Sequence, residues 1–237
     1  MDFKPFDARN YPTLGVREGY AAWSSTYEST VLDEMDIRLL ERIETVDWAA
    51  PARALDLACG TGRTGRWLAN KGAQAIDGVD LMPEMLEKSR ARGVYTDLTV
   101  ADIRDTGFKG GRYGLVTVVL ADEHLPDLGP LYREARRLAR EDGAFVIVGY
   151  HSHFLMNGIP THFNAADGAP RAIESHVHLF SDHVRAAHSA GWSLAEMHEG
   201  LVDEDWIAKK PKWKRFLRHP VSFAMVWRAA GAADACG

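Results

Sequence analysis

Residues 54–65 read Ala54-Leu55-Asp56-Leu57-Ala58-Cys59-Gly60-Thr61-Gly62-Arg63-Thr64-Gly65, and this stretch decides the fold. A short apolar run contains an acid, turns through glycines and enters a helical pattern at 66–69, which predicts a strand, a tight loop and a helix N-terminus. Such a junction presents unpaired backbone N–H groups and the positive end of the helix dipole to a ligand. Glycine at positions 60 and 62 permits positive φ and lets a ligand lie directly on the backbone.

A second acid, Asp80, ends the next strand-like run, residues 75–80. Two acids at two strand ends beside a glycine loop indicate a pocket for a nucleoside with a charged tail. The spacing of Gly60, Gly62 and Gly65 also satisfies the dinucleotide fingerprint, with Asp80 near the position of a ribose-binding acid. A carboxylate at Asp56 would repel a pyrophosphate and suits a cationic group. We therefore favour S-adenosylmethionine, which carries an ammonium and a sulfonium, and keep a nicotinamide or flavin cofactor as the alternative.

Three motifs resemble those of the class I (Rossmann-like) S-adenosylmethionine-dependent methyltransferases. Residues 55–62 look like the first motif, 78–86 like the second, and Ala101-Asp102-Ile103 like the third. The similarity covers about residues 15–228 and is strongest to the small-molecule branch. The chain departs from the family at 113–116, Tyr113-Gly114-Leu115-Val116, where an aspartate is often found.

The resemblance implies roles for individual residues. Asp56 would lie under the methionine ammonium, with Gly60 and Gly62 against the amino-acid and ribose parts of the donor. Asp80 would accept both ribose hydroxyls, and Leu81 and Ile103 would sandwich the adenine. The whole set expected to bind the cofactor is Tyr20, Trp23, Asp56, Ala58, Gly60, Gly62, Asp80, Leu81, Met85, Asp102, Ile103 and Leu120, with Asp102 at the adenine amino group.

Composition limits the class of protein. Apolar residues make up 46% of the 237 residues, enough for one domain with a substantial core. The formal net charge of −5 offers no field to attract a phosphate backbone, so no nucleic-acid partner is expected. The basic run 209–215 is interpreted as a solvated loop. Two cysteines and the lack of a long apolar run predict a soluble, cytoplasmic protein with no membrane partner; the sequence contains no signal for the oligomeric state.

Short apolar runs alternate with helical patterns from residue 53 onward, which predicts an α/β fold with helices on both faces of a mostly parallel sheet. Strands are expected near 53–58, 75–80, 97–101, 114–120, 143–150, 192–200 and 221–227. Helices are expected near 29–46, 64–71, 83–91, 128–140 and 181–190, and an extra strand at 173–180. The resemblance adds that the last of the seven strands returns antiparallel between the fifth and the sixth.

A single methyltransferase domain, 1–237, is expected, with three parts. Residues 1–46 would form an N-terminal lid and helix, 53–150 the cofactor-binding core, and 151–180 and 201–220 inserts around the acceptor. The inserts are rich in histidines and aromatics, and Trp206, Trp213 and Phe216 are candidates for the wall of the acceptor site. This composition indicates a small, partly apolar acceptor.

Methyl transfer from a sulfonium needs alignment and exclusion of water more than a fixed catalytic motif. If the acceptor must lose a proton, His124, after the fourth strand, is the leading base, and His151, past the fifth, is the second. The pairs His151/His153 and His176/His178 have a spacing that a metal could use, but no carboxylate pattern accompanies them, and no metal is expected.

The sequence therefore predicts an S-adenosylmethionine-dependent methyltransferase that methylates oxygen or nitrogen of a small molecule. Two alternatives remain: an NAD(P)-dependent oxidoreductase and a non-catalytic protein that binds S-adenosylmethionine.

Overall fold

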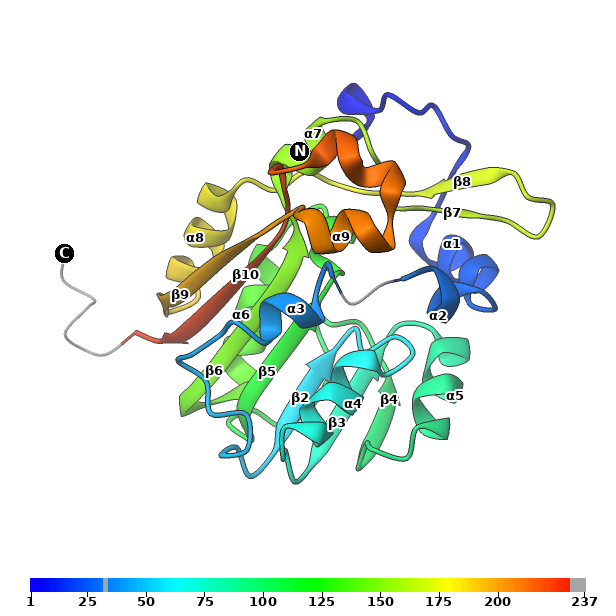
Figure 1. The fold of residues 1–237 in the computed structure, drawn as a ribbon. Helices are drawn as coiled ribbons and strands as arrows, with labels where there is room; N and C mark the ends of the chain where they lie inside the picture. The colour runs from blue at the N-terminus through cyan, green and yellow to red at the C-terminus, as the bar shows by residue number, and fades with distance from the viewer. Residues whose placement is uncertain (32–33, 231–237) are drawn as a thin grey trace.

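A seven-stranded sheet with the order β4-β3-β2-β5-β6-β10-β9 forms the centre of the molecule (Figure 1). The computed structural model describes residues 1–31 and 34–230. The strands are β2 (Ala54–Leu57), β3 (Ile76–Asp80), β4 (Asp97–Val100), β5 (Tyr113–Val119), β6 (Ala139–Tyr150), β9 (Trp192–Leu201) and β10 (Pro220–Ala229). Neighbouring strands in the run β4-β3-β2-β5-β6 are parallel, and β10 pairs antiparallel with both β6 and β9. The predicted mostly parallel sheet, with its last strand returning antiparallel, is confirmed.

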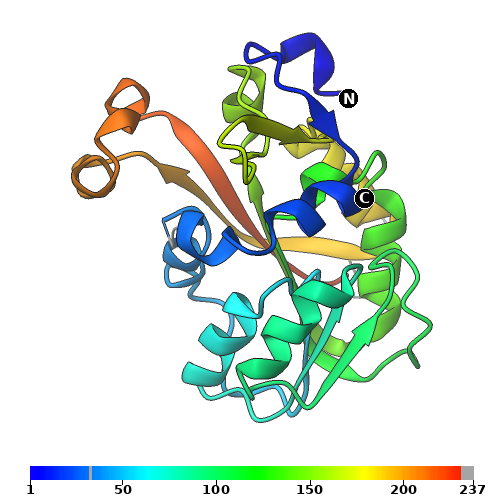
Figure 2. The ribbon, with the colours of Figure 1, turned by 90° about the vertical axis from the view of Figure 1, so that its right-hand side faces the viewer.

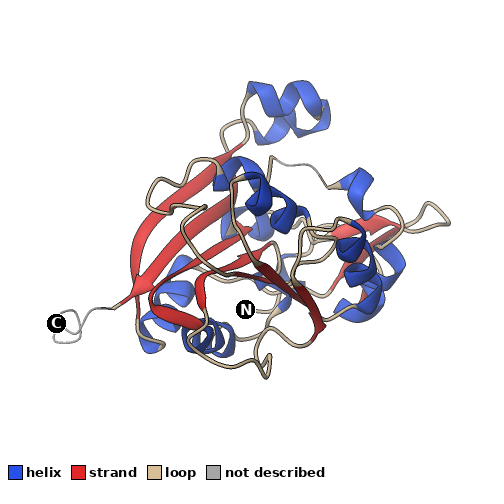
Figure 3. Cartoon of the chain, turned by 90° about the horizontal axis from the view of Figure 1, so that it is seen from below, coloured by secondary structure: helices blue, strands red, loops and turns tan. Residues whose placement is uncertain are grey.

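Helices cover both faces of this sheet, as the view from below shows (Figure 3). They are α3 (Ile37–Leu40), α4 (Arg63–Asn70), α5 (Pro83–Ala91), α6 (Gly129–Leu138) and α8 (Phe180–Ser189). Side chains of β5 alternate between two cores: Leu115 packs in the cluster that contains α3 and α4, and Val116 in the cluster that contains α6 and α8. Burial on both faces explains why β5 is a nearly continuous apolar run.

The remaining elements gather beyond the carboxyl ends of the parallel strands (Figures 1 and 2). They are α1 (Val16–Trp23), α2 (Tyr27–Thr30), α7 (Ser152–Met156), α9 (Glu204–Lys209), the 3₁₀ turns η1 (Lys4–Phe6), η2 (Asp122–His124) and η3 (Pro211–Phe216), and a small sheet of β1 (Thr13–Leu14), β8 (Pro170–Ile173) and β7 (His162–Asn164). Ligands of open α/β sheets bind at this end.

Two predicted elements are wrong. Within the described part of 29–46, the expected helix is replaced by the last two residues of α2, 29–30, and by the short helix α3. Asp36 caps α3 by accepting a hydrogen bond from the Ile37 N–H at 2.7 Å, which starts a new helix inside the predicted one. The strand expected over 173–180 shares only Ile173 with β8, because the His176 N–H donates to the Glu123 carbonyl and Phe180 already begins α8.

Candidate functional site

Two hollows lie at the carboxyl end of the sheet. The first, which we call the loop pocket, has a volume of about 240 Å³ and is bounded by the loops that follow β2, β3 and β5. Ten of the predicted site residues line it: Tyr20, Ala58, Gly60, Asp80, Leu81, Met85, Asp102, Ile103, Leu120 and His124. Trp23, Asp56, Gly62 and His151 do not. Sequence reasoning missed Val16, Tyr27, Met82, Arg104, Val119, Ala121 and Leu125, most of which are apolar neighbours of the motif residues.

Asp80 stands at the end of β3 and ties two loops together. Its Oδ2 accepts the Gly60 N–H at 2.8 Å, and its Oδ1 accepts the Met82 N–H at 2.8 Å. Burial raises the pKa of this carboxyl, while the hydrogen bonds from Met82 and Gly60 oppose that rise. Because the Gly60 N–H is already used, the loop offers one donor fewer to a pyrophosphate, which weakens the dinucleotide alternative.

Gly60 leaves open the space that a donor molecule would fill. Its φ is +53°, and a Cβ built on it would meet no atom within 4 Å, although the residue lines the loop pocket. A side chain here would therefore project into the hollow. The absence of a side chain beside the carboxylate of Asp80 fits the ribose and amino-acid portions of S-adenosylmethionine, which need a bare backbone and acceptors for hydroxyl groups.

The other two glycines of the loop serve packing. A Cβ on Gly62, whose φ is +81°, would lie 3.0 Å from the side chains of Arg92, Ser89 and Tyr95. A Cβ on Gly65 would lie 2.2 Å from the Tyr95 hydroxyl. These glycines thus face Tyr95 and not the pocket, so the fingerprint-like spacing has a structural explanation that involves no pyrophosphate.

Asp56 lies beneath the loop with 1% of its surface exposed. Its Oδ2 accepts the Tyr95 hydroxyl at 2.7 Å and its Oδ1 accepts the Thr117 hydroxyl at 3.0 Å. Burial raises the pKa of this carboxyl to about 7, although the bonds from Tyr95 and Thr117 act in the opposite direction. Asp56 does not line the loop pocket, and its carboxyl group supports the loop from behind through Tyr95 and Thr117.

Two residues that border the loop pocket have unusual backbone conformations. Ala58 has φ +56° and Leu120 has φ +53°, and each directly follows a strand of the parallel sheet. Left-handed conformations cost free energy in residues other than glycine and concentrate at functional sites. Both residues lie where the chain leaves the sheet beside the loop pocket. The strained backbone is therefore found at the same end of the sheet as the sequence motifs.

His124 and His151 have different surroundings. The Nδ1 of His124 lies 2.7 Å from the Glu174 carbonyl and its Nε2 lies 2.9 Å from the Tyr20 hydroxyl. A carbonyl can only accept, so Nδ1 carries the proton and Nε2 accepts from Tyr20. His151 instead caps α7 by accepting the His153 N–H at 3.0 Å and bonds Glu199 through Nε2 at 2.8 Å. Only His124 lines the loop pocket.

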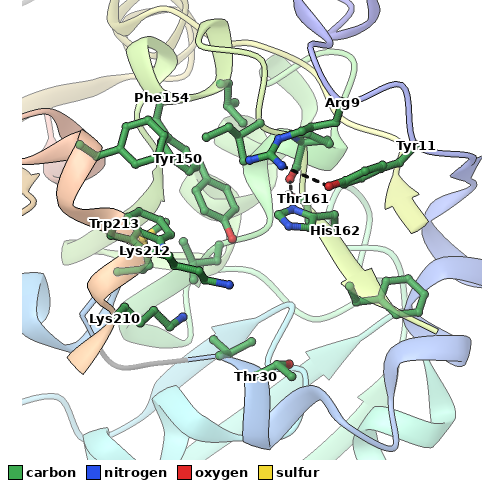
Figure 4. A pocket seen from close by; sticks show the side chains of 18 of the residues that line it. Arg9, Tyr11, Thr30, Tyr150, Phe154, Thr161, His162, Lys210, Lys212 and Trp213 are labelled. Atoms are coloured by element: carbon green, nitrogen blue, oxygen red, sulfur yellow. Dashed lines mark hydrogen bonds between the residues drawn. The ribbon is translucent and has the colours of Figure 1, made fainter. Parts of the chain in front are cut away.

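The second hollow, which we call the aromatic cavity, has a volume of about 610 Å³ (Figure 4). It lies between the N-terminal segment, residues 150–164 and the α9–η3 segment. Trp213 and Phe216 line it as expected, whereas Trp206 is 2% exposed in a neighbouring core and does not. Trp23 lines this cavity rather than the loop pocket and stacks on Phe163 at 5.4 Å. Leu120 lines both hollows.

Within residues 1–31 and 34–230, no three or more His, Cys, Asp or Glu side chains are grouped so that they could hold a metal ion. The same residues contain no helix that is long and apolar enough to cross a membrane.

Comparisons with known proteins agree with this geometry. The family described as "Methyltransferase domain" matches residues 55–147. Malonyl-[acyl-carrier protein] O-methyltransferase of Geobacter sulfurreducens is 30% identical over 213 residues, which are 86% of this chain and 78% of the relative. The enzyme of the same name from Halorhodospira halophila is 29% identical over 205 residues, 84% of this chain, but the match spans only 65% of the relative's length.

Among solved structures, an S-adenosylmethionine-dependent methyltransferase of Mesorhizobium loti has the same fold. Its TM-score is 0.67 at 20% sequence identity, with 82% of this chain and 97% of that chain covered. The sheet order, the glycine loop with Asp80 beside it and the sequence relatives agree. The chain belongs to the class I S-adenosylmethionine-dependent methyltransferases.

Proposed function

We propose that the protein transfers the methyl group of S-adenosylmethionine to an oxygen or nitrogen atom of a small molecule held in the aromatic cavity. The observation that carries this proposal is that the loop pocket and the aromatic cavity lie next to each other and share Leu120 as a lining residue. A donor in the first and an acceptor in the second would come into contact there. The two relatives named above, both O-methyltransferases, support oxygen as the methylated atom.

Bound S-adenosylmethionine supplies an activated methyl group with a good leaving group, so the protein mainly has to align the partners and exclude water. In the proposed arrangement, Asp80 accepts hydrogen bonds from the ribose and Gly60 gives the donor access to the backbone. Asp102, which pairs with Arg104 at 2.6 Å, faces the adenine edge, with Leu81 and Ile103 on the ring faces. Met85 adds apolar wall to the same pocket. Asp56 and Gly62 act indirectly, through the position of the loop.

His124 is the proposed base where the acceptor must lose a proton. Its Nε2 is occupied by the Tyr20 hydroxyl, so a proton would reach it either when that bond is exchanged or through the hydroxyl itself. Burial raises the pKa of Tyr20, which keeps this hydroxyl protonated and able to donate. His151 is not proposed for this step, because it lines neither hollow.

Tyr20→Phe tests this hydrogen bond. The variant keeps the ring, which stacks on Trp23 at 5.9 Å, and loses only the hydroxyl. We expect kcat to fall by up to about tenfold, the scale of one hydrogen bond, with unchanged affinity for S-adenosylhomocysteine. Initial rates and calorimetry measure the two quantities. Full activity in Tyr20→Phe would remove the hydroxyl from the proposed step.

The function itself is tested in two steps. Calorimetry with S-adenosylmethionine and NAD distinguishes a methyltransferase from an oxidoreductase, and preferential binding of NAD would overturn the proposal. Release of S-adenosylhomocysteine with a panel of hydroxyl, carboxyl and amine acceptors then distinguishes an enzyme from a non-catalytic binding protein. Donor binding without transfer to any member of the panel would favour the latter.

The same proposal places the reaction on a small molecule in the cytoplasm and not on nucleic acid. The net charge of −5 would repel a phosphate backbone, and Lys210, Lys212 and Arg215 line the aromatic cavity. Cys59 is buried as a free thiol, which suits a reducing compartment. Fractionation of cells that produce the protein tests the location.

A further inference from the structure

Four cationic side chains line the aromatic cavity. Arg9 comes from the N-terminal segment, and Lys210, Lys212 and Arg215 come from the α9–η3 segment, about 200 residues later in the sequence. Figure 4 shows the nitrogen atoms of Arg9, Lys210 and Lys212 directed into the same space from opposite sides. The fold therefore brings together positive charges that the sequence separates.

None of these cations forms an ion pair with an acid in the described part of the chain. Among the residues that the structure describes, those that line the aromatic cavity include no aspartate or glutamate. Arg9 donates to the Tyr11 hydroxyl at 3.2 Å, Lys210 lies over Trp213, and Arg215 lies over Phe216. By contrast, the neighbouring Lys209 points elsewhere and pairs with Glu34. The cations without a carboxylate partner are thus the ones that face the cavity.

The cationic side chains that line the aromatic cavity also repel one another. Burial and the positive charge of Lys212 lower the pKa of Lys210, and the negative charge of Glu34 partly opposes them. Burial, together with Arg9, Lys212 and Lys210, lowers the pKa of His162, which lines the same cavity. An anion among these groups would relieve the repulsion. Because the whole chain carries a net charge of −5, any preference for anions must come from this local cluster and not from the overall field.

The remaining wall is apolar and aromatic. Phe154 stacks on Trp213 at 5.5 Å and contacts Phe216, and all three side chains line the cavity. Tyr150 stacks on Phe154, and its hydroxyl is directed into the cavity in Figure 4. The cavity volume of about 610 Å³ lies within the range of small-molecule sites. Such a wall suits a planar or apolar body, and Leu120, which also lines the loop pocket, places that body next to the proposed donor site.

We propose that the acceptor carries a carboxylate or phosphate group that is bound by Lys210, Lys212 and Arg9. The rest of the acceptor is an apolar body that packs against Phe154, Trp213 and Phe216. This inference rests on the proposed function. Charge-assisted hydrogen bonds to such a group are stronger than neutral ones. The anionic group either orients the acceptor or, where it is a carboxylate, supplies the oxygen atom that is methylated. In the second case, the neutral ester would lose its attraction to the cluster and leave.

The test uses the full chain saturated with S-adenosylhomocysteine. Calorimetry compares 2-naphthoate and 2-naphthyl phosphate with the neutral 2-naphthamide, which has the same ring system. We expect at least one anion to bind about tenfold or more tightly than the amide, the scale of a charge-assisted hydrogen bond. The better anion identifies whether the cluster selects carboxylate or phosphate.

The variant Lys210→Met/Lys212→Met keeps the apolar stems and removes two charges, so the preference for the anion should fall to about threefold or less. Lys214→Met is the matched control, because Lys214 is an exposed lysine of η3 that does not line the cavity, and its preference should remain. If the double variant fails to fold, the single Lys212→Met replaces it, since Lys212 is exposed at the cavity mouth.

Equal affinity for naphthoate, naphthyl phosphate and naphthamide, or no binding of either anion, would overturn the inference. An equal loss in Lys214→Met would show a general field effect and overturn it as well. S-adenosylhomocysteine binding is measured beforehand in a separate titration of the free protein, and the anion titrations are repeated without it. Donor binding without an anion preference contradicts the anion site alone, whereas an anion preference without donor binding contradicts the proposed methyl transfer and leaves the anion site standing.

Discussion

Replacing Asp80 with alanine is expected to weaken S-adenosylmethionine binding by about 1–3 kcal/mol, or roughly 5- to 150-fold, because a buried hydrogen-bonding group loses its partner. In the free protein, the Asp80 carboxylate holds the Gly60 and Met82 N–H groups. In the proposed complex, it also accepts hydrogen bonds from the ribose hydroxyls. The substitution therefore removes the contact and loosens the two loops that shape the loop pocket.

Calorimetry with the donor and with S-adenosylhomocysteine measures this effect, and thermal unfolding confirms that the variant is folded. Asp97→Ala is the matched control: Asp97 lies on the neighbouring strand β4, 70% of its side chain is exposed, and it pairs with Arg53 away from the pocket. The control should bind the donor as the parent does. Unchanged donor affinity in a folded Asp80→Ala protein would remove Asp80 from the site.

The core of the fold was predictable because its signals are local. The loop after β2 is specified by glycines and by an apolar run, and helix α5 was predicted at 83–91, as observed, from Pro83 at its first position. Outside the core, the spacing of apolar residues predicted elements that the structure does not contain. Polar side chains within 173–180 form hydrogen bonds inside the protein: the His178 Nε2, for example, lies 2.8 Å from the Leu125 carbonyl oxygen. The alternation of apolar and polar residues therefore does not indicate a strand with one face in solvent.

The loop pocket was largely predictable and the cationic cluster was not. Most residues that line the loop pocket lie at or just after the ends of parallel strands, so the topology of the sheet brings them together. The orientation of Lys210 and Lys212 depends on how α9 and η3 pack beside Phe154, which no local pattern reveals. A run of lysines predicts a solvated loop but does not show which of its members face a cavity. The motif likewise identifies Asp56 but not its hydrogen bonds with Tyr95 and Thr117, which depend on the packing beneath the loop.

Asp56→Asn is expected to gain stability relative to the parent protein as the pH rises from about 4 to 7. The pKa of Asp56 is raised from 3.8 to about 7 in the fold, mainly by burial. Between these values the folded protein holds a proton that the unfolded chain has released, so the unfolding free energy falls by about 1.4 kcal/mol per pH unit. The total is on the order of 4 kcal/mol, complete above the folded pKa. Asparagine has no such proton and keeps an acceptor for Thr117.

Urea unfolding of both proteins at several pH values measures this difference, and a constant difference across the range would contradict the raised pKa. Tyr95→Phe supplies an independent check with a defined sign. The Tyr95 hydroxyl donates to Asp56 and favours its ionised form, so removing it should raise the pKa of Asp56 further and extend the loss of stability to higher pH. In the Asp56→Asn background the same substitution should cost a similar amount at every pH below the titration of tyrosine, because no carboxyl remains to respond. A pH-dependent effect of Tyr95→Phe that persists in that background would assign the titration to another group.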